Sequence, residues 1–264
     1  MVLLKQQWRS DRWTIFTWCV TVILLTWLVG GLYQVLNETG TLTEFEELMM
    51  SMPPAARALI GAESLSVLGS FMAGLEYGGI MSIVFLIFLA TYVPGLISKE
   101  VDQRSSEFLL ALPVKRRTVL ASRWLGLAVS MAILSLFQWG SLVVVAGAEA
   151  QPVRYLVASA NMFLLYLEAG TLLLLASIFV DDYPKSTGVC AGLVTALFFY
   201  NAMTESTTGF LSTVREALPF ARFDANAIIG TGKVPGTDMA ILAAGTALFY
   251  YLAMRAFDAK QVAG

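Results

Sequence analysis

Three stretches of this sequence carry side chains that could do chemistry. The segment "EFEELMM", residues 44–50, places glutamates close together, as a carboxylate-based hydrolytic site would. The segment "GTGKV", residues 230–234, looks like part of a phosphate-binding loop, in which backbone N–H groups cradle phosphate. The third candidate is Glu168, an isolated acid inside a long apolar run.

Enzymatic chemistry is poorly supported by the first two stretches. Serine-dependent or metal-dependent hydrolysis usually uses histidine, and the sequence contains none. A phosphate-binding loop needs Ser or Thr after its lysine, where "GTGKV" has Val234. The only two cysteines, Cys19 and Cys190, lie within apolar runs, which argues against a disulfide framework or a Cys/His metal site. We therefore predict neither an intramembrane enzyme nor an ATP-binding site or metal site in this chain.

The composition is that of a membrane protein. The chain is 57 % hydrophobic and 14 % charged, with a mean hydropathy of +0.71, whereas soluble domains have about 25 % charged residues. Apolar runs of about 20 residues cross the ~30 Å hydrocarbon core as helices. Six such runs occur, at 13–36, 77–97, 124–147, 156–180, 187–203 and 238–256. We predict an all-α integral membrane protein in which residues 13–264 form a domain of six transmembrane helices.

The N-terminal residues 1–12 have a pattern of their own. Lys5, Arg9 and Arg12 recur at i, i+4 and i+7, next to a stripe that contains Leu4 and Trp8. This pattern predicts an interfacial (elbow) helix, with a disordered basic tail as the alternative. The first apolar run is too long for a signal-peptide core and lacks a small-x-small cleavage site, so we expect it to be retained.

The basic residues predict the orientation. With the N-terminus inside the cell, twelve lysines and arginines fall in cytoplasmic segments and five fall outside, as the positive-inside rule requires. We therefore predict a multi-pass protein of the cell membrane, surrounded by lipid, with both termini cytoplasmic. The outer loop 37–76 is then acidic and includes Glu76, and its "PPAARALIG" predicts a short helix. The net charge of −2 gives no indication of a nucleic-acid partner.

The largest cytoplasmic loop, residues 98–123, combines charge with an apolar stripe. Glu100 and Arg104 are spaced i, i+4, the favourable order on a helix. An apolar stripe follows, and Pro113 ends the predicted helix. The stripe comprises Phe108, Leu109 and Leu112. Such a helix could dock on a protein partner, or it could lie on anionic lipid with its basic end.

This loop resembles that of type-2 ABC transporter permeases. The resemblance is carried by "ISKEVDQRSSEFLLALPVKRRTVLASRWLGL" between the second and third runs, and by "MPPAARALIG" and "LPFARFDANAIIG" in the outer loops. Family members commonly have a glycine after the acidic start of the loop, where this chain has Ser105 and Ser106. The resemblance extends over nearly the whole chain.

The resemblance implies a coupling helix that sits in a groove of a separate ABC ATPase subunit. By position, the contact residues would be Glu100, Arg104, Glu107, Leu109, Leu110, Pro113, Lys115 and Arg116. The short loop "DDYPKS" would form a second cytoplasmic contact through Asp181, Asp182 and Lys185. ATP and Mg would be bound by that partner, and this chain would carry no cofactor.

The resemblance also implies an exporter whose translocation path is formed by this permease and a second copy or a homologous permease. The small-xxx-small segment "GVCAG", residues 188–192, could serve that pairing or packing within the chain. Nothing in the sequence selects the substrate.

Glu168 supports more than one interpretation. A charged acid near the bilayer midplane costs about 2.5 to 3.5 kcal/mol, and the one basic residue in the six runs, Arg255, stands at the end of the last run, so we expect Glu168 to be protonated or to border a wet path. Glu168 and Gln138 could line the translocation path, or they could bond to each other at similar depth and only fix helix packing. The main rival to the permease function is a secondary transporter, driven by an ion gradient, that uses Glu168.

Overall fold

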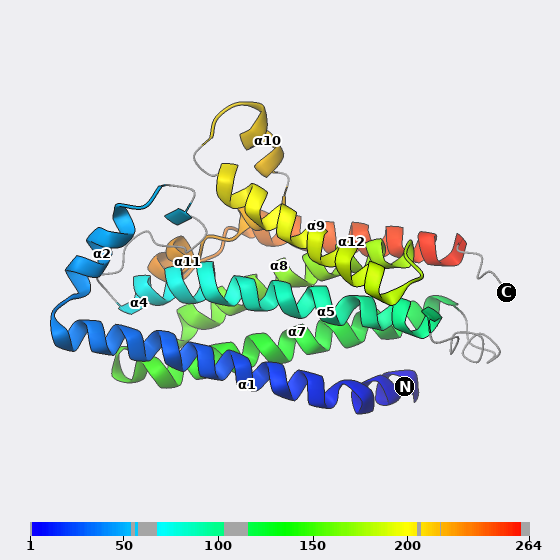
Figure 1. Ribbon diagram of the computed structural model, residues 1–264, viewed down its shortest axis with the longest axis horizontal. Coiled ribbons are helices and arrows are strands. Elements are labelled where there is room, and N and C mark those ends of the chain that lie inside the picture. Colours follow the sequence, from blue (N-terminus) through cyan, green and yellow to red (C-terminus); the bar gives the residue numbers. More distant parts are fainter. Residues whose placement is uncertain are drawn as a thin grey trace.

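The computed structural model is a bundle of long helices that run along one axis (Figure 1). It describes residues 2–53, 56–57, 68–102, 116–204, 207–216 and 218–259, with the side chains of residues 2–6 and 98–102 left aside. Within those ranges the regular elements are all helical and none is a strand. The predicted all-α class is confirmed.

The elements follow one another in the order in which Figure 1 labels them. They are α1 (Val2–Thr39), α2 (Leu42–Met50), α4 (Leu68–Phe71), the π-helix η1 (Met72–Ile80), α5 (Met81–Asp102), α7 (Arg116–Ala146), the short 3₁₀ turn η2 (Gly147–Glu149), α8 (Pro152–Ile178), α9 (Tyr183–Thr204), α10 (Phe210–Glu216), the 3₁₀ turn η3 (Pro219–Arg222), α11 (Ala225–Thr231) and α12 (Gly236–Ala259).

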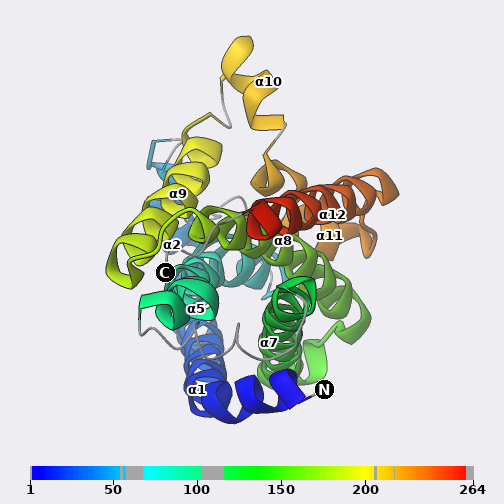
Figure 2. The same cartoon turned by 90° about the vertical axis from the view of Figure 1, so that its right-hand side faces the viewer.

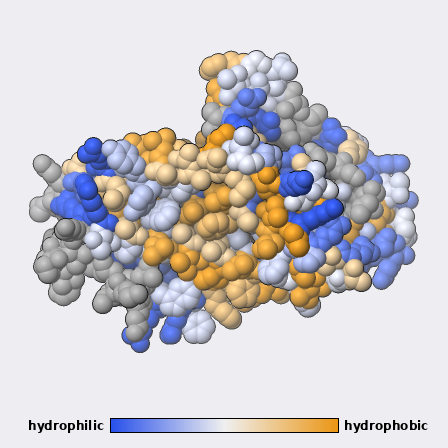
Figure 3. Space-filling view, turned by 180° about the vertical axis from the view of Figure 1, so that it is seen from behind, coloured by the Kyte–Doolittle hydropathy of each residue, from blue (hydrophilic) through white to orange (hydrophobic). Residues whose placement is uncertain are grey.

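Six helical segments are long and apolar enough to cross a membrane. They are Gln7–Thr39, Leu68–Ile97, Arg116–Glu149, Pro152–Ile178, Tyr183–Thr204 and Gly236–Ala259. Figure 3 shows apolar residues around the middle of one face and hydrophilic residues toward its two ends. This distribution is that of a protein whose middle faces hydrocarbon and whose ends face water.

Different helix ends lie at the two ends of the bundle. The start of α1, the end of α5, the start of α7, the α8–α9 turn and the end of α12 lie together at the right of Figure 1, and we call this the terminal end. The helices α2, α4 and α11 lie at the opposite side, the far end, and α10 projects from the bundle beyond the last turn of α9. The predicted cytoplasmic segments thus share one end of the bundle.

Two boundaries differ from the sequence-based expectation. Residues 2–12 belong to the one helix α1, although Figure 2 shows the first turns of α1 crossing the end of the bundle beneath α7, at a steep angle to the rest. The second spanning segment begins at Leu68 rather than at residue 77. Glu76 is therefore a buried residue of that span and not an acid of the outer loop. Most of "PPAARALIG" lies outside the described residues.

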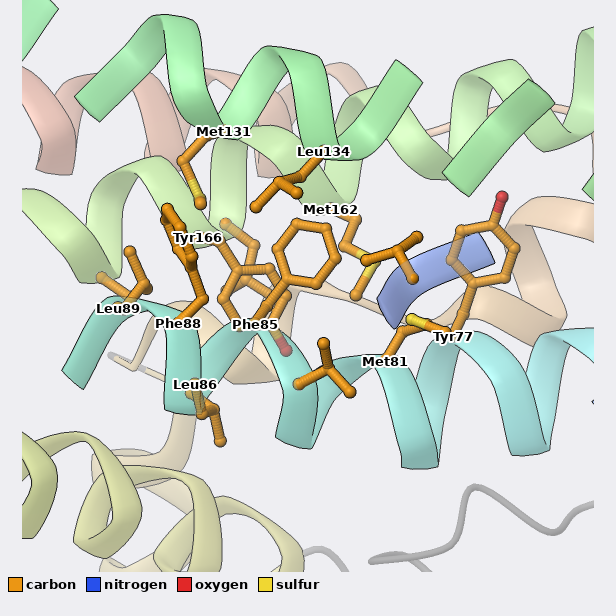
Figure 4. Close-up of a cluster of buried hydrophobic side chains, with 14 of the residues drawn as sticks. Tyr77, Met81, Phe85, Leu86, Phe88, Leu89, Met131, Leu134, Met162 and Tyr166 are labelled. Atoms are coloured by element: carbon orange, nitrogen blue, oxygen red, sulfur yellow. The ribbon is translucent and has the colours of Figure 1, made fainter. Parts of the chain in front are cut away.

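The centre of the bundle is an apolar cluster built by α5, α7 and α8. Figure 4 shows Phe85 and Phe88 of α5 directed toward Met131 and Leu134 of α7 and toward Tyr166 of α8. All five side chains are at most 1 % exposed, and the ring centroids of Phe85 and Tyr166 are 5.1 Å apart. Aromatic pairs at this separation add to the stabilisation from apolar burial.

The π-helix η1 widens the second span just before this cluster. The N–H of Met81 donates to the carbonyl of Glu76, five residues earlier, and the hydroxyl of Ser82 donates to the carbonyl of Tyr77 at 2.8 Å. The Ser82 bond satisfies a backbone carbonyl of the wide turn inside the bundle, where an unpaired carbonyl is costly. Long π-helical stretches are rare and often lie at functional sites.

Candidate functional site

The terminal end carries the residues expected to contact an ATPase. Glu100 lies in the last turn and a half of α5, and Arg116 is the first residue of α7. The other six predicted contact residues lie outside the described residues. They are Arg104, Glu107, Leu109, Leu110, Pro113 and Lys115. The described helix ends nevertheless place both flanks of this loop at the terminal end (Figure 1).

The start of α7 is tied to the end of α12. The Arg117 Nε donates to Asp258 Oδ2 at 2.8 Å, and the two side chains are 63 % and 31 % exposed. Exposed ion pairs contribute about 0 to 1 kcal/mol, so this pair mainly orients two helix ends. It was not predicted from the sequence, because the two residues are far apart along the chain.

The second predicted contact lies in the turn between α8 and α9, at the same end. Asp182 Oδ1 accepts a hydrogen bond from the backbone N–H of Lys185 at 2.9 Å, in the manner of a helix N-cap. The Lys185 Nζ lies 3.6 Å from Asp182 Oδ2, and Asp181 is exposed. The turn therefore presents a carboxylate and an ammonium group to solvent beside the start of α9.

A polar cluster near the terminal end joins α1, α5 and α7, and the sequence pattern does not predict it. The Tyr92 hydroxyl donates to Asp11 Oδ2 at 2.8 Å and accepts from Gln7 Nε2 at 3.4 Å and from the Ser130 hydroxyl at 3.3 Å. Gln7 fits because Gly126 of α7 has no side chain, and a Cβ there would overlap the Gln7 amide. The signal in the sequence was Asp11, one acid among the basic residues of the N-terminal segment.

Glu168 lies inside the bundle, between α8 and α12. It is 6 % exposed, and its Oε2 has no hydrogen-bond partner within the described residues. Its carboxyl lies against Gly245 of α12, where a Cβ would overlap Oε1. Of the six spans, α12 is the least buried within the described residues.

Gln138 is not the partner of Glu168. Two hydrogen bonds set the register of α7 against α8: Trp124 Nε1 donates to the Thr171 hydroxyl at 3.0 Å, and Trp139 Nε1 donates to the Pro152 carbonyl at 2.9 Å. Gln138 is thus level with the start of α8, and from Pro152 to Glu168 that helix rises about 24 Å. Neither side-chain polar atom of Gln138 has a partner among the described residues, so the alternative of a bond between Gln138 and Glu168 is not realised.

A second acid, Glu76, is buried inside the bundle, whereas the sequence predicts it in the outer loop. Glu76 of η1 is fully buried, and its Oε1 is 2.6 Å from the hydroxyl of Thr26 in α1. Its Oε2 has no partner within the described residues. The signal for this position was that the apolar run containing 77–97 continues back to Leu68 and is interrupted by this single acid.

The polar groups of the spans offer no metal-binding cluster in the described part of the chain. No group of three or more His, Cys, Asp and Glu side chains lies close enough there to hold an ion. Cys19 and Cys190 are both buried and free, as is common for cysteines that serve as small packing residues.

Comparison with known proteins supports the family indicated by the loop sequence. The sequence model described as "ABC-2 family transporter protein" matches residues 1–262. A search among curated proteins gave no match. The match covers the six spans and the segments that join them. This chain therefore belongs to the ABC-2 family of transporter proteins and is a multi-pass permease of that family.

Proposed function

We propose that this chain is the permease subunit of an ATP-driven exporter and that it couples to a separate ABC ATPase subunit through its terminal end. The observation that carries the proposal is the match to the ABC-2 family over residues 1–262. ATP and Mg would be bound by the partner, and the terminal end would face the cytoplasm of a cell membrane. A second permease subunit would complete the translocation path.

The arrangement of the helix ends supports contact at the terminal end. The loop between α5 and α7 and the α8–α9 turn emerge at the same end of the bundle, together with the ends of α1 and α12 (Figure 2). A partner seated on the loop would therefore also reach Asp182 and Lys185. Hydrogen bonds from the Tyr92 cluster and the Arg117–Asp258 pair brace the helices on both sides of that loop.

The coupling is tested by changing the predicted contact without disturbing the bundle. Leu109 and Leu110 are replaced together by Asp, and the permease is co-expressed with the ABC ATPase subunit from the same genome. We expect the ATPase to be lost on affinity purification of the permease, because two charges would replace apolar side chains of the coupling helix that enters its groove. Retention of the ATPase would refute the proposed contact.

A matched control lies on α10. Phe210 and Leu211 are 79 % and 47 % exposed and stand beyond the last turn of α9, away from the terminal end. Their joint replacement by Asp makes the same chemical change outside the proposed contact. Expression should be equal for both variants, and the α10 variant should retain the ATPase.

We also assign Glu168 to the border of the translocation path. Its Oε2 is buried without a hydrogen-bond partner in the described residues, and its carboxyl lies against Gly245 of α12. Reconstitution with an ATPase subunit that binds but does not hydrolyse ATP distinguishes the two modes of energy supply. Export that stops supports the ATP-driven permease, whereas export that continues and follows an ion gradient supports secondary transport through Glu168.

A further inference from the structure

The bundle interior around Glu76 contains several buried polar atoms that have no hydrogen-bond partner among the described residues. Three helices meet at Gly30 of α1, where a Cβ would overlap Val145 of α7 and lie 3.3 Å from Cε of Met72 in η1. This contact shows that Gly30, Val145 and Met72 lie at the same height along the bundle. The helical rise per residue then gives the heights of the neighbouring residues on each helix.

One turn from this contact toward the terminal end, each of the three helices carries a polar side chain. Counting four residues back along α1 and α7, and four forward along η1, which runs the opposite way, gives Thr26, Ser141 and Glu76. The bond of 2.6 Å between Thr26 and Glu76 confirms the alignment. Gln138 lies on the same face of α7 as Ser141, one turn further.

A second set of contacts places α8 at this level. The Tyr77 hydroxyl, next to Glu76, lies 2.8 Å from the Ser159 hydroxyl and donates to the Tyr155 carbonyl at 3.1 Å. Gln138 is level with the start of α8, as the bond from Trp139 to Pro152 shows. The polar residues therefore form a belt, which we define as Thr26, Glu76, Ser141 and Gln138.

The belt is buried but its hydrogen bonds are incomplete. Thr26, Glu76 and Gln138 are fully buried and Ser141 is 7 % exposed. Four of their polar atoms have no partner within the described residues. They are Glu76 Oε2, Ser141 Oγ, Gln138 Oε1 and Gln138 Nε2. A buried polar atom that is left unsatisfied is destabilising, so a bound group is expected there.

The unpaired atoms favour an uncharged ligand that both donates and accepts hydrogen bonds. The Thr26 hydroxyl has one hydrogen and lies 3.0 Å from the Val22 carbonyl as well as 2.6 Å from Glu76 Oε1. When it donates to Val22, the carboxyl must supply the hydrogen of the other bond, which leaves Oε2 as an acceptor. The amide of Gln138 then offers donors that a cation could not use, whereas water satisfies donors and acceptors alike.

We propose that the belt of Thr26, Glu76, Ser141 and Gln138 is a water-binding site inside the bundle. The water bridges α1, η1 and α7 at a level where no direct hydrogen bond between described residues joins α7 to the other two. Toward the terminal end the belt is followed by the cluster of Figure 4, in which Phe85, Leu134 and Tyr166 are packed together.

Radiolytic hydroxyl-radical footprinting of the purified permease in detergent tests the site, because radicals form from water and oxidise side chains next to it. Met72 lies one turn from Glu76, whereas Met131 and Met162 lie in the apolar cluster, and all three are fully buried. Surface exposure therefore cannot distinguish them. We expect Met72 to be oxidised several-fold faster than Met131 and Met162. Equal, slow oxidation of all three would overturn the proposal.

A variant adds a second arm. Glu76→Met removes both carboxyl oxygens and fills the space with an apolar side chain, and it should reduce oxidation of Met72 to the rate of Met131. Glu76→Gln keeps a donor and an acceptor and should retain fast oxidation. Fast oxidation of Met72 in a folded Glu76→Met variant would also contradict the site. The wild-type comparison decides the question if a variant fails to fold.

Discussion

The carboxyl of Glu168 in α8 lies against the backbone of Gly245 in α12, with its Oε1 in the space that a Cβ at that position would occupy. Glycine at this position therefore permits the approach of α8 and α12, which is among the most extensive helix contacts of the bundle. The relationship explains how a buried acid is accommodated between two apolar helices. It also makes α12 the element most sensitive to changes of Glu168.

Gly245→Ala should destabilise the permease in detergent. The added methyl group overlaps a buried carboxyl, and overpacking of this kind costs about 1 to 3 kcal/mol. Gly192→Ala on α9 is the matched control, because a Cβ there meets nothing within 4 Å. The midpoint of thermal unfolding should fall for Gly245→Ala alone and should recover when Glu168→Ala is added. Equal midpoints for the two alanine variants would contradict the close contact.

Glu168→Gln and Glu168→Leu separate a role in transport from a role in packing. Both variants should bind the ATPase subunit, and both should lower transport-coupled ATP hydrolysis, because Gln cannot ionise and Leu cannot bond to polar substrate. The measurement is ATP hydrolysis by reconstituted complexes at equal protein. If Leu impairs the complex but Gln does not, Glu168 serves only to pack α8 against α12, and normal activity of both variants would remove it from the mechanism.

Thr208→Cys and Thr118→Cys test the orientation of the bundle. Both positions are exposed, Thr208 just before α10 and Thr118 in the first turn of α7 at the terminal end. In a background without Cys19 and Cys190, an impermeant thiol reagent should label the cysteine at 208 in intact cells and the cysteine at 118 only after lysis. A cysteine at Thr41, which precedes α2, should behave like that at 208. The reverse pattern would invert the topology.

Tyr92→Phe should weaken the attachment of the N-terminal turns of α1. It removes the hydroxyl that bonds to Asp11, Gln7 and Ser130, so the free energy of unfolding should fall by about 1 to 3 kcal/mol. Thr91→Val is the control, because its hydroxyl bonds only to backbone carbonyls of its own helix, at Ile87 and Phe88. In chemical denaturation, the free energy of unfolding should be clearly lower for Tyr92→Phe than for Thr91→Val. An equal loss of unfolding free energy in both variants would show that the cluster adds no stability.

The Tyr92 result can be checked through its partner. If the hydroxyl acts by holding Asp11, then Asp11→Ala should destabilise the wild type more than it destabilises Tyr92→Phe, because contacting residues are not additive. Additive losses would mean that the two side chains act independently.

Much of the fold follows from local patterns in the sequence. The six apolar runs predict the six spans, because a segment of about 20 apolar residues must form its own backbone hydrogen bonds in hydrocarbon. The loop between the second and third runs indicates the family. The apolar pattern predicts the start of the second span too late, because the single acid Glu76 interrupts an apolar run that begins at Leu68.

What the sequence determined by itself is the class of this protein, namely an all-α membrane protein with six spans, since hydropathy and length are properties of each segment alone. Only the tertiary structure decided which polar residues meet. In the structure Glu76 bonds to Thr26, and Tyr92 bonds to Asp11. Glu168 lies against Gly245, and Gln138 lies about 24 Å along the bundle from the level of Glu168. The register and facing of helices depend on how all six spans pack together, and no single run of residues contains that information.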